Sequence, residues 1–114
     1  MVDSVSQSLE RYMDVLAARQ KLVTSNIANV DTPGYKTKDL DFQSEFNNLL
    51  SGAAAAPMGR DVTGLKVKND GNNVNLDREA RLLSENSIRF NAATNLMKGQ
   101  LRMLKSAIHE GQGA

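Results

Sequence analysis

The chain has 114 residues, of which 14 are basic and 13 acidic, so its net charge is +1. This length favours one domain, and the balanced charge argues against a surface that tracks nucleic acid. The absence of cysteine excludes disulfides, thiol catalysis and cysteine-based zinc sites. Because tryptophan is also absent and only 4% of the residues are aromatic, we expect a thinly packed core that partners complete.

Residues 1–30 predict an amphipathic helix that begins near Ser4, where Ser4 and Gln7 match a capping box. The helix is expected to end near Asn29, because Pro33 forbids its continuation. Its apolar side chains recur in steps of four and three, which is typical of a coiled-coil seam. The predicted seam positions in this helix are Val5, Leu9, Tyr12, Leu16 and Val23.

The N-terminal stretch has neither the basic start nor the apolar run of a Sec signal peptide. No stretch approaches 18 apolar residues, so no transmembrane helix is predicted. By these rules alone the protein is expected in the cytosol.

Residues 31–36, DTPGYK, predict a sharp joint after the first helix. Pro33-Gly34 prefers a type II turn, because proline sets φ at the first central position and glycine accepts a positive φ at the second. Asn26 and Asn29 are suited to capping carbonyl groups where the helix ends. We call residues 31–36 the Pro-Gly joint, and we expect it to aim the segment that follows.

The middle segment after the joint lacks the long apolar repeats of the two predicted helices. Tyr35 and Phe42 are expected to fold over the joint as a small apolar lid, and residues 40–50 predict a short helix or turn. Residues 51–64 are small and polar, which predicts a flexible loop. Residues 65–76 alternate on both sides of Asn-Asp-Gly-Asn, which indicates a β-hairpin.

Residues 77–110 predict a second, longer helix, whose acidic residues Asp77 and Glu79 suit the positive N-terminal end of the helix dipole. The tail GQGA is expected to end it. Its apolar residues again recur with heptad spacing. The predicted seam positions are Leu83, Phe90, Met97, Leu101, Leu104 and Ile108.

These elements predict a mainly α-helical protein in one structural domain, with an N-terminal helix (1–30), a middle segment (31–76) and a C-terminal helix (77–114). The two long helices are expected to pair as an antiparallel, coiled-coil-like hairpin, with the turn, the flexible loop and the short β-hairpin between them. Such a hairpin leaves half of each seam exposed to neighbouring subunits. Polar residues in the seam are expected to fix its register; they are Arg19, Asn86 and Thr94.

Candidates for chemistry are few. Asp39, Asp41 and Glu45 are suited to bind a hard cation or to act as acid and base, but the neighbouring lysines favour a solvated turn that leads into a helix cap. His109, near the chain end, is interpreted as a solvated cation. No phosphate loop, G-x-S-x-G or H-E-x-x-H motif occurs. We therefore predict no enzyme activity, cofactor or metal, and keep a hydrolase based on the three carboxylates as a competing hypothesis.

The sequences SNIAN at 25–29 and TPGYK at 32–36 resemble the N-terminal motif of bacterial flagellar rod and hook proteins. The C-terminal half agrees: GNNVNLDRE at 71–79, RFNAA at 89–93 and LKSAI at 104–108 are similar to proximal rod proteins. The short middle segment argues against distal rod and hook proteins. The motif residues are Asn26, Ile27, Ala28, Asn29, Thr32, Pro33, Gly34, Tyr35 and Lys36.

The resemblance implies a structural subunit of the proximal rod of the flagellar basal body, needed for motility and packed helix against helix with copies of itself and other rod proteins. It also implies type III export without a cleaved signal peptide, so a periplasmic rod replaces the cytosolic expectation. Implied neighbours are the export gate, the MS ring and the adaptor FliE. The competing hypothesis is a small helical adaptor or export-chaperone-like protein that binds one partner helix.

Overall fold

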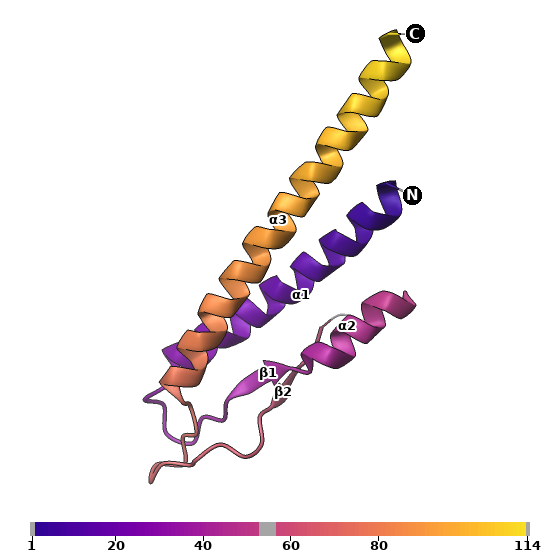
Figure 1. The fold of residues 1–114 in the computed structure, drawn as a ribbon. Helices are drawn as coiled ribbons and strands as arrows, with labels where there is room; N and C mark the ends of the chain where they lie inside the picture. The colour runs from indigo at the N-terminus through magenta and orange to yellow at the C-terminus, as the bar shows by residue number, and fades with distance from the viewer. Residues whose placement is uncertain (1, 53–56, 114) are drawn as a thin grey trace.

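The computed structural model describes residues 2–52 and 57–113, and its principal extents are 71 × 25 × 16 Å (Figure 1). Two long helices run side by side, and a shorter helix and a two-stranded sheet lie along the first of them. In chain order the elements are α1 (Val2–Ala28), β1 (Lys38–Leu40), α2 (Phe42–Ser51), β2 (Gly59–Asp61) and α3 (Leu76–Gly113). The predicted mainly helical class is confirmed.

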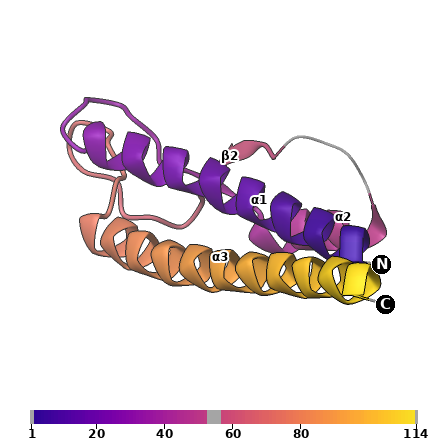
Figure 2. The ribbon, with the colours of Figure 1, turned by 90° about the horizontal axis from the view of Figure 1, so that it is seen from above.

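Helices α1 and α3 form an antiparallel hairpin, and both chain ends point to the same end of the molecule (Figures 1 and 2). Their register is marked by Tyr12, which accepts a hydrogen bond from Arg89 at 3.4 Å. Helix α1 has 27 residues and α3 has 38, which at about 1.5 Å per residue makes them about 40 and 57 Å long. This register places Val2, the start of α1, opposite Gly99, so residues 101–113 of α3 extend beyond α1. We call them the overhang.

The apolar core is small and lies where α1, α3 and the middle segment meet. Helix α2 packs on α1 through Phe42, whose ring meets the ring of Tyr12 edge-on at a centroid distance of 6.2 Å. The guanidinium carbons of Arg19 and Arg89 lie 5.4 and 5.2 Å from the Phe42 centroid, so this ring joins α2 to both long helices. The buried apolar residues are Val15, Leu16, Val23, Leu40, Val74, Leu82 and Ala93.

The helix ends differ in part from those predicted. Helix α1 already includes Val2, so the expected capping box that starts at Ser4 is wrong; Ser4 instead accepts a hydrogen bond on its carbonyl from Ser8. The start of α3 is capped by Asn75, whose Oδ1 accepts a hydrogen bond from the Arg78 amide at 3.1 Å. The tail at 111–113 continues the helix to Gly113 rather than ending it.

The expected β-hairpin lies in another place. Residues 65–76 contain no strand in the structure, whereas β1 and β2 form an antiparallel pair in which Asp39 is the partner of Arg60. The Asn-Asp-Gly-Asn turn does form, since Gly71 has a φ of 86° and its amide donates to the Lys68 carbonyl. The Lys68 amide donates to the Asn72 carbonyl at 2.8 Å, but the residues around the turn otherwise bond to the Pro-Gly joint. A small antiparallel sheet is therefore confirmed, and its predicted position was wrong.

The rest of the middle segment agrees in part with expectation. The short helix predicted at 40–50 is confirmed as α2. Of the loop predicted at 51–64, residues 53–56 lie outside the described residues, and residues 59–61 form β2.

Candidate assembly site: a bonded joint and an exposed seam

The Pro-Gly joint is the predicted type II turn. The amide of Tyr35 donates to the carbonyl of Thr32 at 3.2 Å, and Gly34, between them, has a φ of 75°. The Gly34 amide donates to the Asp70 carbonyl at 2.9 Å. A Cβ atom on Gly71 would come within 3.3 Å of the Gly34 Cα. The two glycines therefore allow two turns, far apart in the sequence, to lie against each other.

The first helix ends on asparagines that have different tasks. Asn29 caps its own helix, donating from Nδ2 to the Ser25 carbonyl at 2.8 Å, as expected. Asn26 is completely buried and reaches across the joint. Its Nδ2 donates to the Lys38 carbonyl at 2.8 Å and to Glu79, while its Oδ1 accepts from the Lys38 amide and the Tyr35 hydroxyl, both at 3.1 Å. Asn26 thus ties α1 to β1 and to α3.

Two further asparagines hold the segment before α3 against the joint. Asn72, which is completely buried, donates from Nδ2 to the carbonyls of Asn29 and Thr32, each at 2.8 Å. The Oδ1 of Asn73 accepts from the Thr37 amide at 2.6 Å. The family resemblance included this stretch of the sequence. No pattern in the neighbouring residues indicated the hydrogen-bond partners of Asn72 and Asn73, which are 36 to 43 residues away in the chain.

Four charged side chains pair with one another beside the joint; we call them the charge cluster, and they are Arg19, Asp39, Arg78 and Glu79. Arg19 pairs with Asp39 through two bonds of 3.1 and 3.0 Å. Arg78 lies 2.7 Å from both Asp39 and Glu79. The side chain of Glu79 is 0% exposed and that of Asp39 is 11% exposed. Two positive and two negative groups balance one another there, so each buried charge depends on its partners.

The carboxylates considered for catalysis do not form a site. Asp39 belongs to the charge cluster, and Asp41 caps α2 by accepting from the Ser44 amide at 3.2 Å. The Glu45 amide closes the first turn of α2 on the Asp41 carbonyl. Among the side chains that the structure describes, no group of three metal-binding residues is found.

The other polar contacts near the joint are on the surface. A hydrogen bond of 2.6 Å to Asp61 raises the pKa of Lys38, but both side chains are about half exposed, and such pairs contribute little to stability.

The predicted apolar lid is only half right. Tyr35 does cover the joint, since its hydroxyl lies against Asn26 and Ser25. Phe42 does not, because β1 carries the chain away from the joint before α2 begins, and the ring packs against Tyr12 instead.

The predicted seam is most buried in the second half of α1 and most exposed at the end of α3. Leu16 and Val23 are buried, and Leu9, Tyr12, Leu83 and Met97 are half-buried. The exposed members are Val5, Phe90, Leu101, Leu104 and Ile108. Leu101 and Ile108 keep 57% and 54% of their surface in solvent, because α1 ends before it can cover them.

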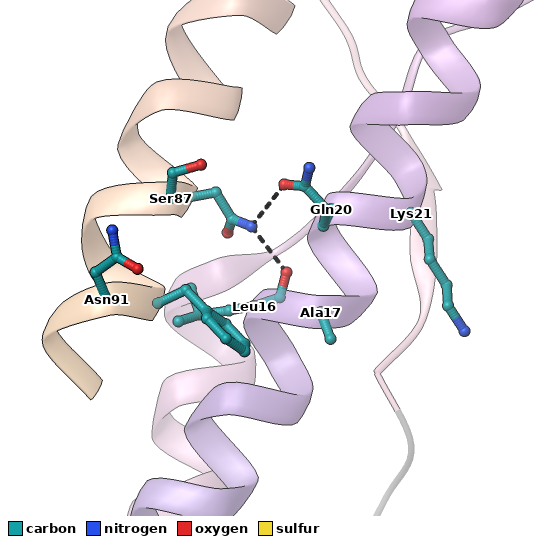
Figure 3. Close-up of a pocket in the computed structure, with 8 residues that line it drawn as sticks. Leu16, Ala17, Gln20, Lys21, Ser87 and Asn91 are labelled. Atoms are coloured by element: carbon teal, nitrogen blue, oxygen red, sulfur yellow. Dashed lines mark hydrogen bonds between the residues drawn. The ribbon is translucent and has the colours of Figure 1, made fainter. Parts of the chain in front are cut away.

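A groove of about 510 Å³ separates the long helices beside the seam. Figure 3 shows Leu16 and Gln20 on the α1 side and Ser87 and Asn91 on the α3 side. The buried Asn86 bridges them, donating from Nδ2 to the Leu16 carbonyl and to Gln20, each at 3.0 Å. Its Oδ1 has no hydrogen-bond partner among the described residues.

The other polar seam residues do not bridge the helices in this way. Arg19 belongs to the charge cluster, and Thr94 donates to the Phe90 carbonyl of its own helix. Of the three, Asn86 alone makes the cross-helix bonds expected of a register-fixing residue.

No helix within the described part of the chain is both long enough and apolar enough to span a membrane. A helical hairpin that is bonded at one end and carries exposed apolar residues along a seam at the other presents a surface of the kind that marks interaction sites between proteins. Comparison with known proteins specifies the kind of protein. The family model for flagella basal body rod proteins matches residues 13–36, which cover the second half of α1 and the Pro-Gly joint.

Curated relatives match over most of their length. The flagellar basal body rod protein FlgB of Borreliella burgdorferi is 32% identical over 110 aligned positions, which cover 75% of this chain and 82% of that protein. FlgB of Bacillus subtilis is 29% identical over 93% of this chain and 94% of its own length. FlgB of Yersinia enterocolitica is 26% identical over 97% of this chain and its own full length. The chain belongs to the FlgB family of flagellar basal body rod proteins.

Proposed function

We propose that this protein is a structural subunit of the proximal rod of the flagellar basal body, held in place by helix-to-helix packing with other rod subunits. Membership of the FlgB family supports the rod as its place. The observation that carries the packing mechanism is the seam of α3, which continues with unchanged heptad spacing beyond the end of α1. Leu101, Leu104 and Ile108 lie on this continuation and are exposed.

The energetic reason is the hydrophobic effect. Complete burial of a leucine or isoleucine side chain is worth about 1.5–3 kcal/mol. Covering the three exposed residues with a neighbouring helix would therefore stabilise an assembly by several kcal/mol, without changing the subunit itself. In the same assembly, the motif residues of the Pro-Gly joint act by setting the angle at which α3 leaves α1.

The proposed neighbours are copies of this chain and other rod proteins. By the resemblance of the motif, we extend the list to the adaptor FliE, the MS ring and the flagellar type III export gate, and we propose export through that gate without a cleaved signal peptide. These finer assignments rest on the family motif alone.

The test replaces Leu101 and Leu104 together by aspartate in cells that lack their own copy of the gene. Two charges on the overhang should prevent packing, so swimming should be lost and isolated basal bodies should lack a complete rod. The matched control is Val67→Asp, which changes an equally exposed apolar residue outside the seam and should leave swimming intact. Normal swimming of the double variant would contradict the proposed mechanism.

A further inference from the structure

The apolar side of the overhang continues the side of α3 that α1 covers. Asn86 marks this side, because it donates a hydrogen bond to the Leu16 carbonyl of α1. At about 100° per residue, Leu104 lies in the same direction around the helix as Asn86, and Leu101 and Ile108 lie within about 60° of it. These three residues of the overhang are exposed. The overhang thus leaves open the position that a longer α1 would occupy.

The basic residues of this stretch lie on the other side of the helix. At about 100° per residue they are about 100° to 160° away from the direction of Asn86, and all of them are exposed. Two copies can therefore meet through the apolar sides of their overhangs without bringing these cations into the contact. The basic residues are Lys98, Arg102, Lys105 and His109.

The open position has the shape of a recess. Helix α1 begins at Val2, opposite Gly99, and Figure 1 shows α3 continuing alone beyond it. The recess is as long as the overhang, about 20 Å at 1.5 Å per residue, and as deep as one helix is thick, about 10 Å. A flat surface such as a lipid bilayer meets α1 before it reaches Leu104, whereas a helix laid end to end with α1 fits.

The start of α1 also selects the direction of the incoming helix. The N-terminal end of a helix carries a partial positive charge and the C-terminal end a partial negative one, so a helix that points its C-terminal end at Val2 is favoured. Among the described elements, the overhang alone projects past the rest of the molecule (Figure 1), and it is the C-terminal end of α3. The overhang of a second copy therefore has the required direction and length, together with an open apolar side.

We propose that the free subunit forms a two-fold dimer in which the overhangs of two copies pack antiparallel, each in the recess beside the other copy's α1. When Gly113 of each copy lies next to Val2 of the other, Ala107 and Ile108 come close to the two-fold axis. Leu104 of each copy then lies opposite Gly111 of the other. The recesses of both copies are filled by this one contact.

Such a contact closes, because the same patch is used on both copies. It covers Leu104 and Ile108, so the dimer must open before a rod neighbour can pack on them. The inference goes beyond the proposed function, since it concerns the subunit before assembly. Only about three and a half helical turns of each copy take part, so we expect a weak dimer with a Kd on the order of 10 to 100 μM.

The first test is the size and shape of the purified full chain. Sedimentation velocity should show a dimer that forms on the order of 100 μM. Small-angle X-ray scattering should give it a maximum dimension of about 120 Å, because two subunits of 71 Å overlap only by their overhangs. Ile108→Asp should raise the Kd about tenfold or more. The matched control is Ile88→Asp, a residue 70% exposed on the far side of the same helix, which should leave the Kd unchanged.

A disulfide provides a second measurement that does not depend on removing an apolar residue. The sequence contains no cysteine, so Ala107→Cys places the only thiol of each copy beside the proposed two-fold axis. Ser106→Cys, its neighbour in the chain, places the thiol on the far side of the helix and is the control. On oxidation of the purified chains at equal concentration, the Ala107→Cys chain should form a disulfide dimer about five times faster or more.

Three results would overturn the proposal. The chain could stay monomeric up to about 1 mM, its dimer could be no longer than one subunit, or the two cysteine variants could cross-link at equal rates. Binding to phosphatidylglycerol vesicles that is lost in Ile108→Asp, without any dimer, would show that lipid reaches the apolar side instead. Because these measurements use the purified chain, failure of the dimer leaves the rod function standing, and normal swimming of the Leu101 and Leu104 double variant would leave the dimer standing.

Discussion

At the end of the hairpin near the Pro-Gly joint, buried polar groups such as Asn26 and Glu79 are bonded to one another, whereas at the opposite end apolar residues such as Leu101 and Ile108 lie in solvent. Figure 1 shows the loops gathered at the first end and the two chain termini at the second. The comparison shows how one small chain can have a well-defined fold at one end and an uncovered apolar surface at the other. Hydrogen bonds and ion pairs require particular partners at particular angles, so they determine the angle between α1 and α3 within a single subunit. The hydrophobic effect is not directional, so the exposed seam can be buried by a neighbouring subunit without requiring particular bond angles.

The largest expected effect on stability comes from breaking the bonded end. Glu79→Ala removes one of the two acceptors of the Asn26 Nδ2 group and leaves Arg78 without one of its two carboxylates. Loss of one partner from a buried, paired set costs about 3–5 kcal/mol. The free energy of unfolding, measured by urea titration with circular dichroism, should fall by this amount. The control is Glu85→Ala, whose pair with Arg89 is about 42% exposed on each side and is worth about 0–1 kcal/mol; equal losses in the two variants would refute the role of the charge cluster.

A smaller loss is expected when the asparagine link to the joint is cut. Asn72→Ala leaves the carbonyls of Asn29 and Thr32 and the amide of Val74 without their side-chain partner. Each unsatisfied buried group costs about 1–3 kcal/mol, and water can reach part of this surface, so we expect about 2 kcal/mol in the same titration. Asn47→Ala on α2, where the side chain is exposed, is the matched control. A loss below 0.5 kcal/mol for Asn72→Ala would mean that the joint does not depend on this link.

The turn itself should contribute less. Gly34 has a φ of 75°, and no atom lies within 4 Å of an added Cβ, so the expected cost of Gly34→Val is backbone strain. A left-handed conformation costs about 1–2 kcal/mol for a residue with a side chain, and the melting temperature should fall accordingly. Gly99→Ala, in the interior of α3 with nothing within 4 Å of the new Cβ, should raise it, by up to about 1 kcal/mol in stability. A rise for Gly34→Val would contradict the type II turn.

The smallest effect on the isolated subunit should come from the exposed end. Leu101→Asp changes a residue that keeps 57% of its surface in solvent, and substitutions at such surfaces usually stay within about 0.5 kcal/mol. The unfolding curve of the purified chain should therefore match that of the unchanged protein, even though assembly is lost when Leu101 and Leu104 are both changed. A large loss of stability would show that the overhang packs within the subunit, and the contrast between the two ends would fail.

The sequence predicted those features whose causes are close together in the chain. The two long helices follow from apolar repeats, α2 from its own short pattern, and the type II turn from the Pro33-Gly34 pair. Where the prediction was wrong, contacts with a distant segment of the chain outweighed the local conformational preference. The residues around Gly71 have the pattern of a hairpin, but Asn72 and Asn73 bond to residues 29–37 instead.

The candidate site divides in the same way. The exposed seam could be read from the spacing of Leu101, Leu104 and Ile108, because heptad spacing is a local property of one helix. The charge cluster could not, because Arg19, Asp39 and Arg78 look like surface residues in the sequence and are brought together from α1, β1 and α3. The family motif marked the joint without indicating what its residues contact.

By itself, then, the sequence determined two amphipathic helices, the sharp turn that ends the first of them, and a family of rod proteins recognised by a motif. Only the tertiary structure decided which residues bond across the joint and how far α3 passes beyond α1. The physical reason is range: helix periodicity and turn geometry act over a few residues, whereas the bond from Asn26 to Glu79 joins positions 53 residues apart. Such a bond exists only after the chain has folded back on itself.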